Sequence, residues 1–178
     1  IEGFHQDYYN SIGKKIENKI PKIEVYEYGY AGYDFADQLH LVNAYKEQFD
    51  LIDHVILGIK FSNDLTRGEY NVIKERLNLE SPINRLLKKY LENFKSLVSK
   101  YGFDKKRFTL LLDSRITSST FLYYLKQNDF IYIDFAHAFE KSKKSKTLIY
   151  DKHWNNHGRN IIANLITGYL KTIRLENK

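Results

Sequence analysis

Two residues near the end of the chain, Asp151 and His153, have the types and the spacing that acid–base catalysis needs. A carboxylate beside an imidazole fixes the tautomer of the ring and stabilises the imidazolium that forms when the ring accepts a proton. Two positions apart in an irregular turn, both side chains can point into one cleft. The same spacing also fits a capping turn, with Asp151 near a helix start and His153 merely exposed.

A metal centre built on Asp151, His153 and His157 is a further interpretation, because carboxylates and imidazoles both bind Zn²⁺. No other cluster of ligand-type residues accompanies them, so we predict no metal. The chain has no cysteine, which excludes disulfides, cysteine-zinc sites, iron–sulfur clusters and thiol nucleophiles. We also predict no organic cofactor, because no Walker-type phosphate loop and no dinucleotide fingerprint follows any predicted strand.

Two further positions have groups that can stabilise negative charge on an oxygen atom. The amide of Asn63 follows a predicted strand, where it can donate to a developing oxyanion, and Gly32 can offer a backbone N–H in a tight turn. Asp64 can hydrogen-bond within the loop and hold Asn63 in place. The alternatives are an ordinary Asx turn at Asn63 and a glycine that only supplies positive φ.

Helices and short apolar strands alternate along the chain, with Asp34 as a predicted N-cap and a polar loop over residues 60–67. Hydrophobic spacing predicts strands over residues 23–28, 51–59, 108–112 and 130–133, and helices over residues 6–20, 34–48, 82–101, 117–128 and 155–173. This order implies right-handed crossovers and a parallel sheet covered on both faces. We therefore predict a single α/β domain over residues 1–178, with the site at the carboxyl ends of the strands.

Composition limits the partners of the chain. Its 178 residues carry a net charge of +6 and are 43% hydrophobic, which supports a real core. Basic charge with 15% aromatic residues is also found in nucleic-acid-binding proteins. We predict no nucleic-acid partner, because the aromatic residues fall at core spacing rather than in a basic strip. No apolar run approaches the ~20 residues of a membrane span. The compartment and the oligomeric state stay open.

Three blocks of the chain, in order, resemble those of the SGNH (GDSL-type) esterase and lipase superfamily. Residues 25–33 are similar to its second block, a strand that runs into a glycine turn, and residues 55–65 to its third block, an apolar strand followed by Asn-Asp. Residues 151–158, Asp-Lys-His-Trp-Asn-Asn-His-Gly, resemble the last block, in the variant where Asp precedes His by two positions and Trp follows. The resemblance spans nearly the whole chain.

This resemblance implies a three-layer α/β/α sandwich with a flavodoxin-like parallel sheet, and a serine esterase without a cofactor. His153 would be the general base, Asp151 would orient it, and Gly32 and Asn63 would form the oxyanion hole. Asp64 and Trp154 would support the site or contact the substrate: Asp64 by holding Asn63, and Trp154 as a packing residue or as a platform for a sugar.

The nucleophilic Ser of the family stands in a Gly-Asp-Ser block that the sequence does not contain. Residues 1–4 resemble those that follow this Ser, so we expect the first strand and the nucleophile upstream of Ile1. Asp113-Ser114 also follows a strand, but in the wrong order along the chain, and we interpret it as a strand-end turn.

Relatives with the Asp-x-His-Trp variant are often associated with adding or removing acyl groups on carbohydrates. We therefore predict an O-acyl, most simply acetyl, hydrolase or transferase that acts on a glycan or another small ester. Two alternatives stay open. One is a noncatalytic sugar- or protein-binding domain on the same fold, and the other is a flavodoxin-like module that binds a phosphate-bearing ligand.

Overall fold

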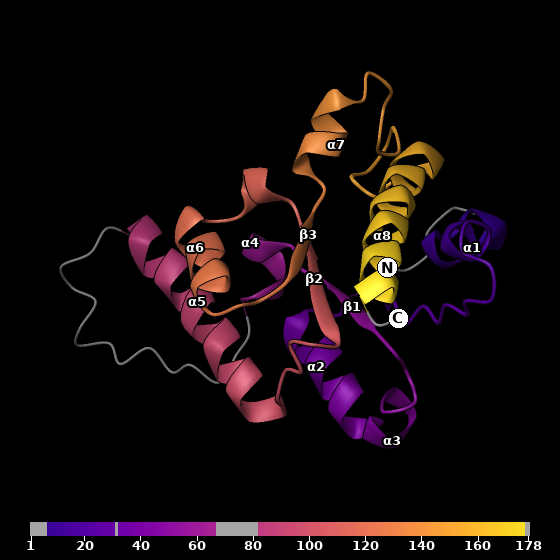
Figure 1. Ribbon diagram of the computed structural model, residues 1–178. Helices are drawn as coiled ribbons and strands as arrows, with labels where there is room; N and C mark the ends of the chain where they lie inside the picture. The colour runs from indigo at the N-terminus through magenta and orange to yellow at the C-terminus, as the bar shows by residue number, and fades with distance from the viewer. Residues whose placement is uncertain (1–6, 31, 67–81, 177–178) are drawn as a thin grey trace. The chain divides into compact units, whose positions relative to one another are not determined.

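The computed structural model describes residues 7–30, 32–66 and 82–176, and it has an α/β fold (Figure 1). Its sheet is parallel and three-stranded, in the order β1–β2–β3. The strands are β1 (Val55–Gly58), β2 (Phe108–Leu112) and β3 (Tyr132–Asp134). The three predicted strands after residue 50 are thus confirmed, with β1 and β3 shorter than predicted.

The chain divides into two compact units, which are described separately below. We call residues Gly32–Tyr132 the central unit, and Ile1–Ala31 with Ile133–Lys178 the terminal unit. The helices of the central unit are α2 (Phe35–Ala44), α3 (Lys46–Phe49), α4 (Phe61–Asp64), α5 (Pro82–Tyr101), η3 (Ser114–Ile116) and α6 (Ser119–Gln127). Those of the terminal unit are η1 (Tyr8–Asn10), α1 (Ile12–Glu17), α7 (Ala136–Lys141) and α8 (Asn156–Glu176).

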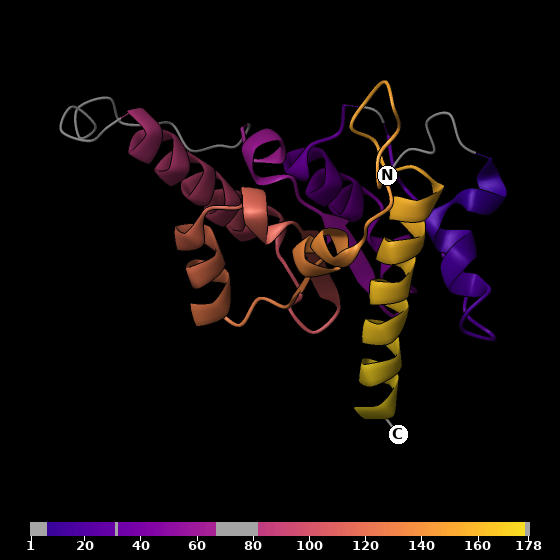
Figure 2. The ribbon, with the colours of Figure 1, turned by 90° about the horizontal axis from the view of Figure 1, so that it is seen from above.

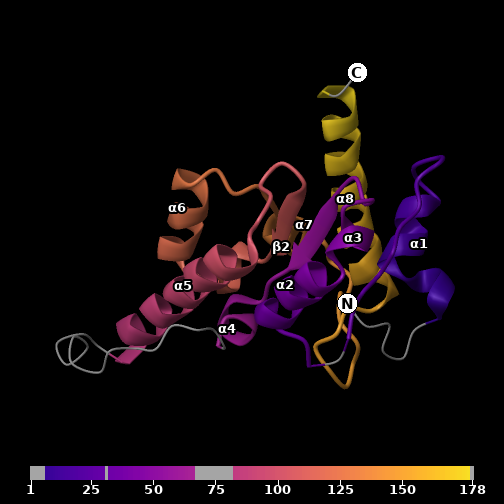
Figure 3. The same ribbon diagram turned by 90° about the horizontal axis from the view of Figure 1, so that it is seen from below.

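The central unit is built around the β1–β2 pair. Every residue of β2 is buried, as its unbroken apolar run predicts, and Val55 pairs with Phe108 at the start of the parallel register. Helices α2 and α5 lie side by side (Figure 3), and their rings Phe35 and Phe94 stack at 5.2 Å. Phe121 of α6 meets Phe94 edge to face, so apolar side chains from three helices and the sheet form one core.

Capping explains where α2 begins and where α5 ends. The carboxylate of Asp34 accepts from the N–H of Asp37, and the Asp37 side chain accepts from the N–H of Asp34, so the predicted N-cap forms a full capping box. Helix α5 ends before Gly102, whose φ of +80° is the left-handed conformation that favours glycine. The Ser81-Pro82 order predicts Ser81 as the N-cap of α5, and Ser81 lies outside the described residues.

The terminal unit buries its apolar residues between helices. Helix α1 packs along α8 (Figure 2), where Ile12 and Ile16 of α1 and Ile162 and Ile166 of α8 are buried. Helix α7 also contacts α8. The face of α8 that these helices contact is the face that the spacing of its apolar residues predicts to be buried.

Four local predictions are wrong. The predicted helix at 34–48 is divided into α2 and α3, because the backbone of Tyr45 is not helical there (φ −112°, ψ 38°). Residues 23–28 form no strand: the N–H of Val25 donates to the Glu17 carboxylate at 2.9 Å, so the alternating side chains belong to an irregular segment beside α1.

The predicted polar loop at 60–67 contains the short helix α4, because buried Phe61 anchors it to the core. The predicted helix at 6–20 is divided into η1 and α1, because Ser11 caps a new helix there.

A half-buried histidine makes the central unit sensitive to acid. Nε2 of His54 lies 2.9 Å from the Thr109 hydroxyl, and burial, together with the nearby Arg107 cation, lowers the pKa of His54. Because the unfolded chain binds this proton more readily, folding gains stability above about pH 6.5 and loses it as the pH falls through the lower folded pKa. We expect the Tm to fall between pH 7 and pH 5, and to fall less in His54→Gln.

Thermal unfolding at several pH values checks this prediction. His137→Gln, which replaces an exposed histidine on α7, is the control. An unchanged pH dependence in His54→Gln would show that His54 is not the group responsible.

Candidate functional site

The loop that carries Asp151 and His153 is closed by backbone hydrogen bonds. Thr147 and Trp154 form an antiparallel bridge, and the N–H of Leu148 donates to the His153 carbonyl at 2.9 Å. These contacts close residues 148–153 into a tight loop between α7 and α8. The two predicted acid–base residues therefore lie in one closed turn.

Asp151 contacts His153 through both carboxylate oxygens. Oδ1 accepts from the His153 backbone N–H at 2.7 Å, and Oδ2 lies 3.1 Å from Nδ1 of the ring. A carboxylate at this nitrogen favours the tautomer with a proton on Nδ1, which leaves the lone pair on Nε2. The His153 side chain is 56% exposed, so its ring is accessible from solvent. The sequence-predicted pair thus has the geometry of an oriented base.

Asn155 and Gly158, at the start of α8, hold the turn in place. Oδ1 of Asn155 accepts from the Gly158 N–H at 3.0 Å and caps α8, while Nδ2 donates to the carbonyls of Ser145 and Thr147. A Cβ added to Gly158 would overlap the Lys146 carbonyl oxygen, so the close approach of helix and loop needs glycine.

We expect Asn155→Ala to lower the free energy of unfolding by about 1–2 kcal/mol, because the variant loses the helix cap. It also loses the two donors that hold the loop. Urea denaturation measures the change. Asn156→Ala, at the next and exposed position, is the matched control and should change stability by less than about 0.5 kcal/mol. Equal stability of Asn155→Ala and the parent protein would contradict this account of the turn.

Trp154 packs against α7. Its ring lies edge to face with Phe135 at 5.3 Å and with Phe139 at 6.0 Å. Its backbone carbonyl accepts from Nε of the buried Arg159, whose pKa is lowered by burial. Trp154 therefore fixes the loop to the helices on both sides of it.

Asn63 and Asp64 lie in α4 of the central unit and bond to each other. Nδ2 of Asn63 donates to Oδ1 of Asp64 at 2.9 Å, and Oδ2 of Asp64 accepts from the Lys60 N–H at 2.8 Å. Burial raises the pKa of Asp64, and the nearby Asp34 carboxylate adds to this, whereas the two hydrogen bonds act in the opposite direction. Asp64 therefore holds the exposed Asn63 amide in one orientation.

Helix α5 supports this turn from inside the central unit. Nδ2 of the buried Asn93 donates to the Leu65 carbonyl at 2.9 Å, and the Tyr90 ring meets Phe61 edge to face at 5.3 Å.

Gly32, at the start of the same unit, is exposed and has a φ of +78°. This positive φ fits both interpretations of Gly32, as an N–H donor in a tight turn and as a glycine that only supplies positive φ.

The structure brings Asp151, His153 and Trp154 into one turn of the terminal unit. Asn63 and Asp64 form a second pair in the central unit, which also contains Gly32. The resemblance at residues 1–4 lies outside the described residues. Asp113-Ser114 starts the short helix η3, with Asp113 bonded to Arg115 at 2.6 Å, so it is the predicted strand-end turn.

A serine–histidine contact, for which no local pattern in the sequence is a signal, joins α7 to α8. Oγ of Ser142 lies 2.7 Å from Nε2 of His157, across the gap between the end of α7 and the first turn of α8. The two residues are 15 positions apart, so no local motif links them. A hydroxyl at this distance from an imidazole is the first requirement of a serine nucleophile.

Among the side chains that the structure describes, no group of three or more His, Asp or Glu residues is arranged to hold a metal ion. In the same residues, no helix has both the length and the apolar character to cross a membrane. No family model matches the sequence, and no curated protein and no solved structure matches it significantly.

Proposed function

We propose that the protein is a serine ester hydrolase or acyltransferase that acts on an acylated carbohydrate or another small ester. The observation that carries this proposal is the contact between the Asp151 carboxylate and Nδ1 of His153, at 3.1 Å, in a turn closed by its own hydrogen bonds. An exposed imidazole oriented by a carboxylate is the acid–base part of a catalytic triad.

In this proposal a serine hydroxyl attacks the ester carbonyl carbon, and its proton passes to Nε2 of His153. The carbonyl C–O bond to the alcohol then breaks, and His153 returns the proton to the leaving alkoxide. Water or an acceptor hydroxyl attacks the acyl-enzyme and gives its proton to His153, which releases the acyl product and restores the serine. Asp151 stabilises the imidazolium in both halves of the reaction, and no cofactor takes part.

The remaining roles are extensions of the resemblance. Gly32 N–H and the Asn63 amide are proposed as oxyanion donors, and Asp64 as the residue that orients Asn63. The fold is proposed to be the three-layer α/β/α sandwich of the SGNH type, and the nucleophilic serine is proposed to precede Ile1. Ser142, although it contacts His157, is not assigned as the nucleophile, because Asp151 contacts His153 and not His157 in the described turn.

Ester turnover by the natural protein, including any residues that precede Ile1, tests the proposal. We expect hydrolysis of p-nitrophenyl acetate and release of acetate from acetylated oligosaccharides, with no added metal. An absence of turnover on both substrate types, in folded protein, would overturn it.

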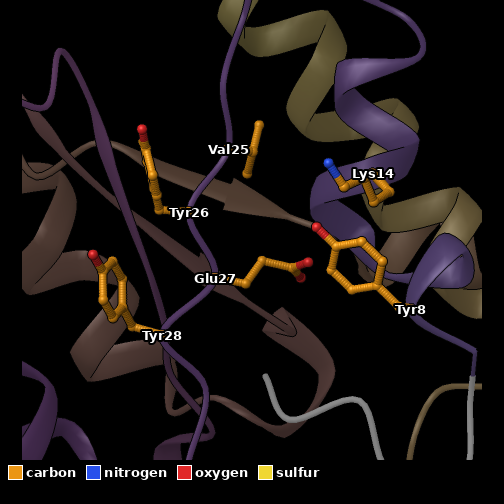
Figure 4. Close-up of a pocket in the computed structure, with 6 residues that line it drawn as sticks. All are labelled: Tyr8, Lys14, Val25, Tyr26, Glu27 and Tyr28. Carbon is orange, nitrogen blue, oxygen red and sulfur yellow. The ribbon is translucent and has the colours of Figure 1, made fainter.

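A noncatalytic binding domain is the second candidate, and one observation favours it: a cleft with several tyrosine side chains lies in the terminal unit (Figure 4). Such a domain would bind a ligand and show no turnover. The same assay therefore separates the two candidates.

A further inference from the structure

The loop between α7 and α8 presents two adjacent apolar side chains to solvent. Ile149 is 103% exposed and Tyr150 is 68% exposed, and both belong to the irregular turn over residues 148–153. Figure 2 shows that the loop stands out from the ends of the two helices that it joins. Single exposed apolar residues are ordinary, but apolar residues gathered at one exposed place are typical of an interaction surface.

The base of this loop is fixed to the helices of the terminal unit. Thr147 and Trp154 form the antiparallel bridge that closes it, and the Asn155 amide donates to the Thr147 carbonyl at 2.9 Å. The Trp154 ring packs on Phe139 of α7. Because the base is already ordered, the tip can bind a partner with a small entropic cost.

Positive charge surrounds the apolar tip. Residues 141–153 contain five lysines and one acidic residue, Asp151. Four of the lysines are exposed: Lys141, Lys143, Lys144 and Lys152. The Asp151 carboxylate contacts Nδ1 of His153 at 3.1 Å, and its side chain is 30% exposed. Lysine ammonium groups therefore dominate the charge that the loop presents on both sides of Ile149 and Tyr150.

An anionic lipid surface is the partner that this combination fits. Acidic headgroups attract lysines that come within a Debye length of them. Below the headgroups, the acyl chains take up an aliphatic side chain such as Ile149, and tyrosine rings favour the level between the two. A nucleic acid also attracts lysines, but it offers no apolar phase for Ile149. A projecting tip suits a fluid bilayer, which needs no preformed hollow to receive it.

We propose that this loop docks the protein on an anionic membrane surface, with Ile149 and Tyr150 inserted at the headgroup level and the lysines on lipid phosphates. The inference goes beyond the proposed function and does not rest on it, because it uses neither a nucleophile nor ester chemistry. The Asp151–His153 pair belongs to the same loop, so docking holds that pair at the lipid surface.

Co-sedimentation of the full chain with lipid vesicles tests the inference. Vesicles of phosphatidylcholine alone are compared with vesicles of an equal mixture of phosphatidylcholine and phosphatidylglycerol. We expect the partition coefficient to be at least about tenfold higher on the mixed vesicles, and to fall as salt is added.

Two double variants separate the apolar and the charged contributions. Ile149→Ser with Tyr150→Ser should lower the partition coefficient on the mixed vesicles at least about tenfold, because the inserted side chains are lost. Lys143→Gln with Lys144→Gln should lower it about fivefold for each lysine removed. All of these positions are exposed, and circular dichroism confirms that the variants fold.

Matched controls come from the central unit. Leu51→Ser removes an apolar side chain that is 85% exposed, and Lys105→Gln with Lys106→Gln removes two adjacent, exposed lysines from the turn between α5 and β2. Both should bind the mixed vesicles as the parent does. Equal losses in these controls and in the loop variants would overturn the assignment to this loop.

Three further results would overturn the proposal. They are no binding to the mixed vesicles, equal binding to both kinds of vesicle, and unchanged binding in the Ile149→Ser, Tyr150→Ser variant. Binding of an oligo-dT by a protein that ignores the vesicles would assign the lysines to a nucleic acid instead. No ester is present in the assay, so loss of ester turnover with intact vesicle binding contradicts the proposed function alone.

Discussion

Replacing His153 by alanine is expected to lower kcat for ester hydrolysis by about 10²–10⁴-fold, because the serine loses its general base. Stability should stay within about 0.5 kcal/mol of the parent, since the His153 side chain is 56% exposed. Asp151→Asn should also lower kcat, because an amide at Oδ2 no longer selects the tautomer with the proton on Nδ1. Initial rates on p-nitrophenyl acetate, at saturating substrate, measure both effects.

Two histidine variants make this prediction specific. His137→Ala removes an exposed imidazole from α7 and should keep the parental rate. His157→Ala removes the partner of Ser142 and should also leave the chemical step in place. If the rate fell in His157→Ala and not in His153→Ala, the assignment of the base would be wrong.

Gly158→Ala is expected to lower the free energy of unfolding by about 2–3 kcal/mol. A methyl group at this position overlaps the Lys146 carbonyl and approaches Cβ of Trp154 to 3.3 Å, so either α8 or the loop must move. The neighbouring Asn155 hydrogen bonds would be strained by the same shift. Urea denaturation measures the loss, and ester turnover should fall with it because His153 belongs to this loop.

Gly168→Ala is the matched control on the same helix. Its Cβ would meet nothing within 4 Å, and the position is exposed. Alanine is the better helix former, so this variant should be more stable than the parent by about 0.5–1 kcal/mol. Equal effects at Gly158 and Gly168 would mean that the close approach of α8 to the loop is absent in solution.

The parts of the fold that depend on local patterns were predictable from the sequence. The apolar run of β2 and the Asp34 cap of α2 are signals that lie within a few residues, and the structure confirms both. The strand predicted over residues 23–28 is wrong, because strict alternation indicates only that the two sides of the chain differ in polarity. Here one side faces α1, through Glu27 over Gly13, instead of facing another layer of a sheet.

The candidate site was predictable where its residues are close in sequence. Asp151 and His153 are two positions apart, so their types and spacing predict the contact that the turn forms. Helix α7 was missed because its six residues are too few for a clear period, and its start depends on Asp134, whose carboxylate accepts from the Ala136 N–H. The Ser142–His157 contact depends on how α7 ends beside α8, which no local pattern encodes.

Labelling of the natural protein with a fluorophosphonate, followed by mass mapping of its peptides, tests the central claim most directly. An activated serine reacts with this probe only when a base removes its proton. We predict one labelled serine, located before Ile1, and loss of the label in His153→Ala. Absence of any labelled serine, or a label on Ser142 that persists in His153→Ala, would contradict the assignment of His153 as the base of a serine esterase.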